Sequence, residues 1–543
     1  MSDSRPSNRR DFLKTSLAAT AGIAALPKWM ASQTASGASS FELNEITLDD
    51  LRRGLESGRF TARDLAKQYL SRIESIDKAG PRVNSVIEIN PDALAIADDL
   101  DKERQAKGRP GPLHGIPVLI KDNIATTDRM QTTAGSLALV GSRPPKDSAV
   151  AARLRAAGAV ILGKTNCSEW ANFRGNHSTS GWSARGGLTH NPYALDRNPS
   201  GSSSGSGVAT SANLCALSVG TETDGSIVSP SSLNGIVGIK PTVGLISRSG
   251  IIPISHTQDT AGPMARTVAD AAALLTVLAG VDPDDSATEG SRTHLQTDYG
   301  RFLDANGLRG ARLGVVRKYA GFNIHVDRVF EEALAALKHA GAEIVDPVEI
   351  ATIEKLDEPE SQVLQFEFKT DLNRYLAGLG TSSPVHSLAD IIAFNLKNSA
   401  RELPYFGQEL MEKSQAKGDL TSSDYQKSLA DCARLSRKEG IDASMDKLRL
   451  DALIAPTDGP AWPTDFVNGD HFSSGTSTLA AVAAYPHVTV PMGFVFGLPV
   501  GISFFGRAWS EPVLIRVAYA YEQATRLRKV PQFAVMAPIP MPS

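Results

Sequence analysis

Two serines and one lysine lie in settings that could expose a reacting side chain to a substrate. Each serine lies in a turn of small residues, and the lysine lies at the end of an apolar run. Ser226 closes the run 220–226, Ser202 lies in the Ser-rich turn 200–205, and Lys121 ends the apolar run 115–121. None of these segments contains a histidine. A serine hydroxyl is a weak nucleophile that needs a base within hydrogen-bonding reach. Because burial disfavours the ammonium form of lysine, a lysine on a buried strand can be that base. These residues indicate a Ser-Ser-Lys amide hydrolase.

The elements that would position these residues alternate as in an α/β fold. Residues 115–121 are bounded by Gly and Pro, which predicts a buried strand ending at Lys121. A helix at 149–157 and a strand at 159–163 follow and continue the βαβ rhythm. Further expected helices cover 207–213, 268–280 and 512–528, with helices throughout 47–107, and further expected strands cover 216–220, 451–457, 488–491 and 498–502.

Residues 163–207 are rich in Gly, Ser, Asn and Trp and predict a long irregular segment. Such a segment inside a compact body is more often an active-site wall than a linker. Its residues 201–205 match the nucleophile elbow of α/β-hydrolases with Ser203 at the centre. That elbow needs a strand before it, whereas 191–200 reads as turns. A phosphate-binding loop is also disfavoured, because no Gly-Lys-Ser/Thr follows the glycines.

From about residue 41 to about residue 532 the chain resembles the amidase signature family. The resemblance rests on the segments around Lys121, Ser202 and Ser226, and the interval of 24 residues between the serines equals the family's fixed interval. The stretches 170–175, 180–187 and 250–255 resemble the peptide amidase branch. The family's common Gly-Gly-Ser-Ile-Arg is here 224–228, Asp-Gly-Ser-Ile-Val, and its common Gly-Gly-Ser-Ser-Gly-Gly is here 200–205, Ser-Gly-Ser-Ser-Ser-Gly. Both departures bear on substrate preference more than on catalysis.

The resemblance implies a role for each of these residues. Lys121 is the implied base, Ser202 the bridging serine after a cis peptide bond, and Ser226 the nucleophile. The implied oxyanion-binding and substrate-binding positions are Ala171, Thr223, Asp224 and Gly225, together with the backbone N–H of Ser226. The implied fold is a single large α/β domain, in which helices cover a mixed β-sheet and residues 300–450 pack over the active site.

Four other titratable residues near these motifs have structural explanations that compete with functional ones. For Asp122 and Asp224 we expect a local hydrogen bond to the backbone, with a role in proton transfer as the alternative. For His114 and His256 we expect a packed or hydrogen-bonded side chain, with catalysis as the alternative, because the proposed relay already has a base.

The irregular segment 163–207 also holds arginines and aromatic residues whose position decides their role. Arg174 and Arg185 are expected as solvated loop residues, with the holding of a substrate carbonyl as the alternative. Trp170, Phe173 and Trp182 are expected in the core, with the pocket wall as the alternative.

Composition limits the classes of partner. The chain has 543 residues, 41% of them hydrophobic, which is enough for a large core, and its formal net charge is −3. Lys and Arg are scattered, so a nucleic-acid partner is not expected. Cys167, Cys215 and Cys432 are too few for a disulfide framework or a zinc site, and we expect them as buried small hydrophobes, with one Cys167–Cys215 pairing left open. We expect no metal or cofactor.

The N-terminal residues 1–40 have the features of a twin-arginine (Tat) export signal and spacer. Arg9 and Arg10 precede Phe-Leu-Lys, a weakly apolar stretch at 17–26 and small residues up to Ser40. The apolar stretch is shorter than the ~18 residues that a membrane span needs. We therefore expect the Tat translocon as a partner during export, and a mature protein in the periplasm or outside the cell with no membrane association. A short amphipathic helix packed on the body is the alternative.

The sequence predicts an amidase domain at 41–532 and a C-terminal tail at 533–543. The expected activity is hydrolysis of the C-terminal amide of peptides, or of related carboxamides, to acid and ammonia through an acyl-enzyme. A broad aliphatic or aryl acylamidase is the first alternative. A glutamine-hydrolysing amidotransferase subunit is the second, disfavoured by the export signal and the absence of a basic face.

The twin arginines make the export hypothesis testable. Replacing both Arg9 and Arg10 with lysine is expected to block export and to leave the uncut precursor in the cytoplasm, because the translocon reads the arginine pair. Fractionation and N-terminal sequencing measure this. Efficient export of the double variant, or an intact Met1 terminus on periplasmic protein, would show that the leader has another function.

Overall fold

A computed structural model describes residues 41–108 and 111–538 of the chain. The predicted export signal and spacer at 1–40 and the last part of the predicted tail, 539–543, lie outside the described residues. The chain divides into a unit 1–44, of which 41–44 form a turn, and a unit 45–543 that holds the elements below. Residues of the predicted tail pair with the loop before the Ser-rich turn, since Ala534 forms a parallel bridge with Ala194.

The described residues form a mixed sheet, as the family resemblance implied, and this sheet has eleven strands. Parallel pairs lie near both ends of the sheet, and antiparallel pairs join them in the middle. In spatial order the strands are β1 (Val86–Ile89), β3 (Val160–Thr165), β2 (Pro117–Lys121), β6 (Leu217–Glu222), β8 (Thr260–Ala265), β7 (Val237–Lys240), β12 (His487–Val495), β13 (Leu498–Phe505), β11 (Ala452–Pro456), β9 (Arg312–Val315) and β10 (Glu343–Val345). A separate short pair joins β4 (Trp182–Ser183) to β5 (Gly187–Leu188).

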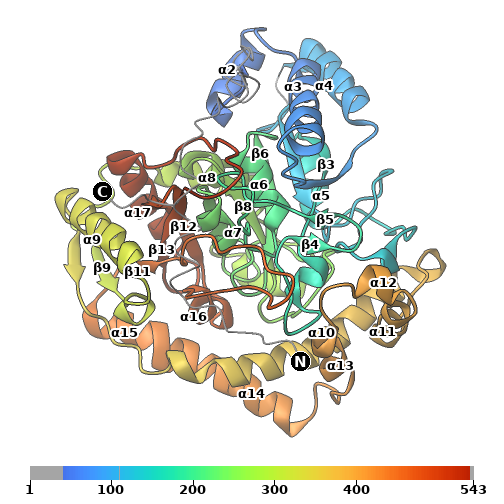
Figure 1. The fold of residues 1–543 in the computed structure, drawn as a ribbon. Helices are drawn as coiled ribbons and strands as arrows, with labels where there is room; N and C mark the ends of the chain where they lie inside the picture. Colours follow the sequence, from blue (N-terminus) through green and yellow to red (C-terminus); the bar gives the residue numbers. More distant parts are fainter. Residues whose placement is uncertain (1–40, 109–110, 539–543) are drawn as a thin grey trace, which may run out of the picture. The chain divides into compact units, whose positions relative to one another are not determined.

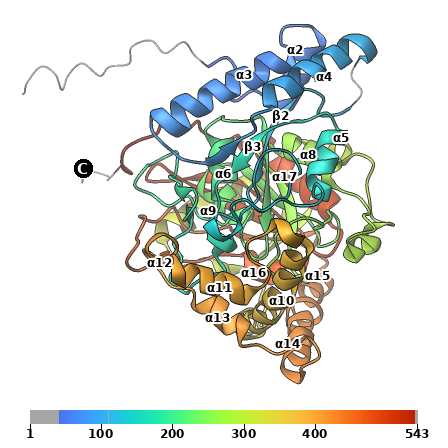
Figure 2. The ribbon, with the colours of Figure 1, turned by 90° about the vertical axis from the view of Figure 1, so that its right-hand side faces the viewer.

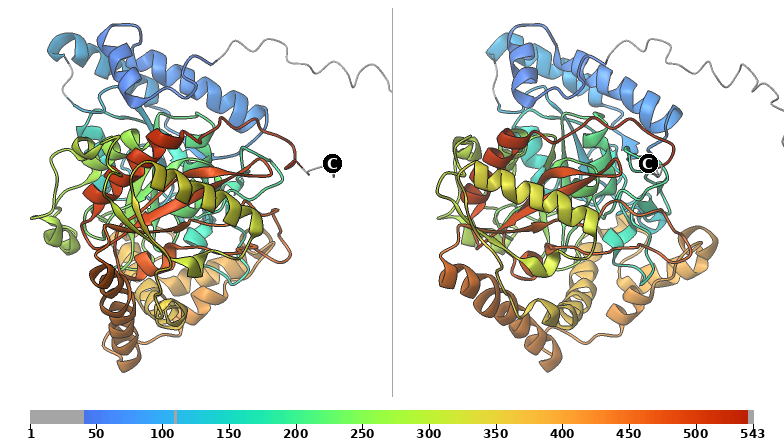
Figure 3. Two further views of the ribbon diagram at one scale, coloured as in Figure 1. Left: turned by 90° about the vertical axis from the view of Figure 1, so that its left-hand side faces the viewer. Right: turned by 60° about the vertical axis from the view of Figure 1, so that its left-hand side comes forward.

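Helices cover this sheet, so the fold is the predicted single large α/β domain. Those of the first half are α2 (Leu48–Glu56), α3 (Ala62–Arg72), α4 (Ala93–Lys107), α5 (Ala149–Ala156), α6 (Ser204–Ser211), α7 (Val228–Leu233) and α8 (Val268–Leu278). Those of the second half are α9 (Ile324–His339), α10 (Asp357–Gly378), α11 (Leu388–Lys397), α12 (Ser399–Glu402), α13 (Glu409–Gln415), α14 (Ser423–Ala433), α15 (Asp442–Leu448), α16 (Ser477–Val482) and α17 (Glu511–Thr525). In Figures 1 and 2 the blue helices α2 to α4 lie at one end and α10 to α14 at the other, with the strands between them. Helices α9 and α17 both pack against β12 (Figure 3).

The strand that carries Lys121 is buried along its whole length. All five residues of β2 are buried between the parallel neighbours β3 and β6, which explains why the run is continuously apolar until the lysine. The carboxyl ends of parallel strands meet at one edge of a sheet, where ligands of α/β proteins commonly bind. Lys121 and the last residues of β6 therefore come together.

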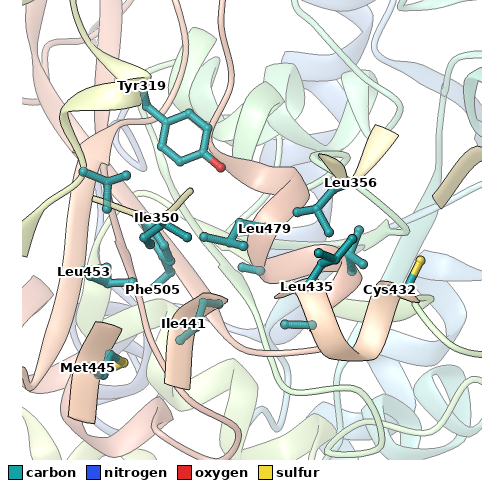
Figure 4. Close-up of a cluster of buried hydrophobic side chains, with 14 of the residues drawn as sticks. Tyr319, Ile350, Leu356, Cys432, Leu435, Ile441, Met445, Leu453, Leu479 and Phe505 are labelled. Atoms are coloured by element: carbon teal, nitrogen blue, oxygen red, sulfur yellow. The ribbon is translucent and has the colours of Figure 1, made fainter. Parts of the chain in front are cut away.

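The middle region packs against strands that come later in the chain. Figure 4 shows Ile350 beside Leu453 and Phe505, and Tyr319 and Leu356 belong to the same cluster of buried side chains. These contacts join segments far apart in sequence through burial of apolar surface, which is the main stabilising contribution to such packing. The middle region is therefore an integral part of the same core.

The structure corrects two predictions about local elements. Residues 86–89, within the segment predicted as helical, form β1, which pairs antiparallel with β3. The helix predicted at 207–213 begins earlier and ends earlier, at Ser204 and Ser211. Thr47 caps α2, since its hydroxyl accepts a hydrogen bond from the N–H of Asp50. Within the described ranges no helix is long and apolar enough to cross a membrane.

Candidate active site

The structure brings Lys121 and Ser202 into direct contact. Lys121 Nζ donates to Ser202 Oγ at 2.7 Å and to Thr221 Oγ1 at 2.9 Å, and it lies 3.3 Å from the Thr221 carbonyl oxygen. Thr221 Oγ1 also accepts a hydrogen bond from Asn123 Nδ2 at 2.9 Å. Lys121 and Ser202 are both fully buried. The amine is therefore fixed by hydroxyl and carbonyl groups, and no carboxylate of the described residues bonds to it.

Burial lowers the pKa of the Lys121 ammonium to about 8. The cause is the removal of the charge from water, which the more distant Asp259 and Glu222 carboxylates oppose only in part. The neutral amine is the form that accepts a proton, and its fraction rises as the pH rises through about 8. Lys164 and Lys240 are also buried, with pKa values lowered to about 8, but Lys164 donates to Thr132 Oγ1 and Lys240 to the Tyr485 carbonyl. Lys121 differs from them by its contact with Ser202.

Ser202 lies in the turn immediately before α6. The Gly201–Ser202 peptide bond is cis, as the resemblance implied. The Ser202 carbonyl oxygen accepts a hydrogen bond from the Ser168 N–H at 3.1 Å, which ties the turn to the irregular segment 163–207.

Ser226 lies in the tight turn between β6 and α7, at the edge of a cavity of about 330 Å³. Two backbone groups next to Ser226, the N–H of Ile227 and of Val228, donate to the buried Glu222 carboxylate at 2.7 and 3.0 Å. The N–H of Ser203 donates to the Ser226 carbonyl oxygen at 3.2 Å, so the two serine segments are joined directly. Glycine is required at 225, where φ is +78° and an added Cβ would lie 3.0 Å from Ser477 Oγ.

The remaining predicted positions line the same cavity as Ser226. They are Ala171, Thr223, Asp224 and Gly225. Ser202 lines a narrow recess of about 10 Å³ that shares three lining residues with the cavity, Ala171, Thr223 and Ile254. Ser226 and Ser202 therefore border two hollows whose walls share these three residues, and Lys121 contacts Ser202. A larger cavity of about 480 Å³, lined by Arg248, His256 and Tyr375 among others, is lined by none of the three.

An unusual backbone conformation places Ala171 in the cavity wall. Trp170, Ala171 and Asn172 have φ values of 49°, 54° and 69°, a left-handed run that side chains other than glycine rarely adopt. Such conformations persist where the surrounding structure holds them, often at functional sites. Here the N–H of Trp170 donates to the Ala134 carbonyl and that of Ala171 to the Ser168 carbonyl.

The two acidic candidates differ from each other. Asp122 accepts a backbone bond, as predicted, but its donor is not local: it is the Gly135 N–H, 13 residues away, at 3.1 Å. Asp122 also pairs with Arg185 at 3.2 Å. For Asp224 the prediction of a backbone bond is wrong: the carboxylate accepts from Thr478 Oγ1 at 2.7 Å. Burial raises the pKa of the Asp224 carboxyl, and its other oxygen has no hydrogen-bond partner in the described part of the chain.

The arginines are neither solvated nor arranged around the cavity. Arg174 is fully buried, pairs with Glu169 and donates to the carbonyl groups of Glu402, Phe406 and Gly407, so it connects the irregular segment to the middle region. Arg185 pairs with Glu88 and Asp122. Neither lines the cavity at Ser226. Their interpretation as solvated residues is therefore wrong.

The aromatic and histidine residues largely follow the structural expectation. Trp170 and Trp182 are buried, whereas Phe173 lines the cavity. The ring of His114 lies 3.0 Å from the Leu100 carbonyl oxygen, and His256 Nδ1 lies 2.7 Å from Asp371 Oδ2.

The three cysteines are buried and free. The expectation that they act as small core residues is confirmed, and the Cys167–Cys215 disulfide that was left open does not form.

Comparison with known proteins identifies the family. The family model described as Amidase matches residues 64–515. The chain belongs to the amidase family. A solved peptide amidase in complex with the competitive inhibitor chymostatin is 52% identical and covers 90% of this chain and 99% of its own, with a TM-score of 0.87. The native peptide amidase from Stenotrophomonas maltophilia is 51% identical over 91% of this chain and 99% of its own, also with a TM-score of 0.87.

Curated relatives within the family have different activities. A probable amidase of Arabidopsis thaliana is 43% identical over 504 residues, which cover 91% of this chain and 93% of the relative. A glutamyl-tRNA(Gln) amidotransferase chain of Pseudomonas syringae is 32% identical over 494 residues, covering 89% of this chain and 98% of the relative. The protein is a hydrolase that acts on amide C–N bonds, and its substrate has to be inferred from its own cavity.

Residues that sequence reasoning missed hold this site together. Thr221 and Asn123 fix the Lys121 amine, and Glu222 organises the turn at Ser226. The signal in the sequence was slight: Asn123 follows the lysine by two residues, and Thr221 and Glu222 lie within the run that ends at Ser226.

The position of Lys121 leads to a prediction about pH. Since only the neutral amine accepts a proton, amide turnover is expected to rise with pH along a limb centred near 8 and to level off above it. Lys121→Arg stays charged and is expected to lose about 10²–10⁴-fold in kcat, the usual contribution of a general base.

The pH–rate profile of folded variants measures this, with Lys164→Met as the matched control because Lys164 is a buried lysine with a similarly lowered pKa. The control is expected to keep the limb near pH 8. A limb that disappears in Lys164→Met, or a Lys121→Arg enzyme as active as the wild type, would place the base elsewhere.

Proposed function

We propose that the protein is a serine amidase that hydrolyses the C-terminal amide of peptides to the free acid and ammonia. The observation that carries the proposal is the buried 2.7 Å hydrogen bond between Lys121 Nζ and Ser202 Oγ, next to a cavity edged by Ser226. The identity of 52% to a peptide amidase supports the choice of substrate class.

In the proposed mechanism neutral Lys121 accepts a proton from Ser202, which accepts one from Ser226 as the Ser226 oxygen attacks the amide carbonyl. The N–H groups of residues 223–226 stabilise the oxyanion, a contribution worth about 10²–10³-fold in kcat per donor. The C–N bond then breaks, and the leaving nitrogen takes the proton back through Ser202 to depart as ammonia. Water hydrolyses the acyl-enzyme by the same relay in reverse and regenerates Ser226.

The shape of the cavity favours a peptide over a small carboxamide. Its volume of about 330 Å³ lies within the range of small-ligand sites. Phe173, Ile254, Leu364, Trp462 and Phe472 provide apolar walls for side chains. Leu364 comes from α10 of the middle region, so this region forms part of the wall above the nucleophile.

The charges of the cavity disfavour a substrate that carries a carboxylate next to the amide. Asp224 and Asp470 are the charged residues among the described lining residues, and no Lys, Arg or His is among them. Asp470 is held by Ser180, Asn198 and Trp462. A carboxylate brought into this cavity would lack a cationic partner and would face two acidic groups, which argues against glutamine and for release of the acid product.

The proposed location is the periplasm or the outside of the cell, on the basis of the twin-arginine leader. The proposed relay uses side chains and water and needs no metal ion.

Ammonia release across a substrate panel tests the proposal. Peptide amides are expected to be hydrolysed with a higher kcat/KM than amino-acid amides, simple carboxamides, aryl acylamides or glutamine. A dipeptide amide that ends in methionine is expected to exceed its glutamate counterpart by about 10-fold or more, because juxtaposed like charges cost several kcal/mol.

Ser226→Ala is the control for this panel and is expected to release no ammonia while keeping the wild-type circular dichroism spectrum. Preference for aryl acylamides or for glutamine would replace the peptide amidase proposal by the corresponding alternative. Wild-type-like turnover by folded Ser226→Ala would overturn the assignment of the nucleophile.

A further inference from the structure

One loop holds Thr223, the first residue of the turn that carries Ser226, from two sides. Thr223 Oγ1 donates to Asp259 Oδ1 at 2.6 Å, and Gln258 Nε2 donates to the Thr223 carbonyl oxygen at 3.4 Å. Thr223 lines both the cavity and the recess, so any shift of this residue changes the wall beside the nucleophile.

The sheet places Asp259 opposite Thr223. Strands β6 and β8 pair antiparallel, and the last pair of their ladder joins Glu222 to Thr260. In an antiparallel ladder the next residues of the two chains are also neighbours, and these are Thr223 and Asp259. The contact therefore continues the sheet register into the turn.

Asp259 is itself fixed by backbone groups. Its second oxygen, Oδ2, accepts hydrogen bonds from the N–H groups of Ile254 at 2.8 Å and Ser255 at 2.9 Å. One carboxylate thus closes its own loop with one oxygen and holds Thr223 with the other. Bonds from backbone N–H groups to a carboxylate are charge-assisted and short, which suits a rigid support.

Acidic side chains of helix α10 accept hydrogen bonds from this loop. Glu367 accepts from Ser255 Oγ, from the Thr257 N–H at 3.2 Å and from Thr257 Oγ1 at 3.0 Å. Asp371 accepts from the His256 N–H at 3.0 Å, and Glu360 accepts from Gln258 Nε2 at 2.8 Å. The acidic residues 360, 367 and 371 recur at helical spacing, so one face of α10 holds the loop.

We infer that Asp259 is a positioning residue, which acts through the Thr223 hydroxyl to hold the 223–226 turn in the geometry that stabilises the oxyanion. The inference rests on the proposed function. Donors of an oxyanion hole act because they are fixed before the reaction, so loosening their support weakens transition-state binding more than substrate binding. Asp259 has hydrogen bonds to Thr223, Ile254 and Ser255, and its proposed effect passes through the first of these.

A double-mutant cycle tests the inference. Thr223→Val removes the hydroxyl and leaves the bonds of Asp259 to its own loop in place, and Asp259→Asn alters the acceptor. Each is expected to lower kcat by up to about 100-fold with little change in KM, as misplacement of a site group by a remote change can do. Thr223→Ser is expected to recover most of the kcat lost in Thr223→Val.

Because both changes break one contact, the double variant is expected to be no slower than the slower single variant. The affinity for a peptide aldehyde, which forms a tetrahedral adduct, is expected to fall in parallel with kcat/KM. Thr126→Val is the matched control, since the buried Thr126 hydroxyl donates to Asp128 at 3.0 Å and lines neither the cavity nor the recess, and it is expected to leave kcat unchanged.

Three results would overturn the inference: a Thr223→Val enzyme with wild-type kcat, additive losses in the cycle, or losses confined to KM. An unaltered maximal kcat in Asp259→Asn would do so too. The pH limb of this variant is expected to move to lower pH in either case, because the Asp259 carboxylate raises the pKa of Lys121. Thr223→Val decides the matter alone if Asp259→Asn does not fold. Failure of the wild type to release ammonia from any amide would instead refute the proposed function.

Discussion

A lysine amine that is buried without a carboxylate partner among the described residues is the constraint on which the site depends. Lys121 Nζ has hydroxyl and carbonyl oxygens as neighbours, so nothing compensates the ammonium charge fully and its pKa falls to about 8. A carboxylate in contact would stabilise the ammonium and remove the base from the neutral range. The lysine has this environment because it ends a fully buried strand and because Ser202 and Thr221 lie against its amine.

The other residues of the site hold two turns in place by hydrogen bonds, the turn that carries Ser202 and the turn that carries Ser226. Glu222 binds the backbone after Ser226, Asp259 and Gln258 hold Thr223, and the Ser203 N–H joins the two serine segments. Carboxylates are used here as hydrogen-bond acceptors for N–H and hydroxyl groups and lie away from the lysine amine. The middle region contributes through α10, whose acidic face fixes the loop 254–259 and whose Leu364 forms part of the cavity wall. One helix thus both holds the loop and lines the cavity.

Much of the fold could be predicted from the sequence where local pattern and burial agree. The strands at Pro117–Lys121 and Val160–Thr165 and the helix at Val268–Leu278 follow apolar runs of the right length and were predicted. Strand β1 was missed because it has four residues between two helices, too few to show the alternation of apolar and polar residues that marks a strand. Its pairing with β3 makes it a strand. Strands β7 and β8 contain Gly, Thr and Pro, and their partners in the sheet determine them.

For the site, the sequence indicated the residues that we propose react, but it did not indicate the residues that hold them. The two serines stand in motifs with a recognisable interval. The structure places Lys121 in contact with Ser202 and joins the two serine segments through the Ser203 N–H and the Ser226 carbonyl oxygen. Thr221 is 100 residues from Lys121, and Asp259 is 36 residues from Thr223, so only the folded sheet reveals these contacts. Burial alone would not have selected Lys121 either, since Lys164 and Lys240 are equally buried.

The central claim is that Lys121 loses its proton near pH 8 because of its surroundings. The direct measurement is a carbon-13 NMR titration of the lysine ε-carbons in the folded protein, with the Lys121 resonance assigned by its absence in Lys121→Arg. The account predicts a midpoint near 8 for that resonance. A Lys121 resonance that remains that of the ammonium up to about pH 10.4, the ordinary value for lysine, would contradict it.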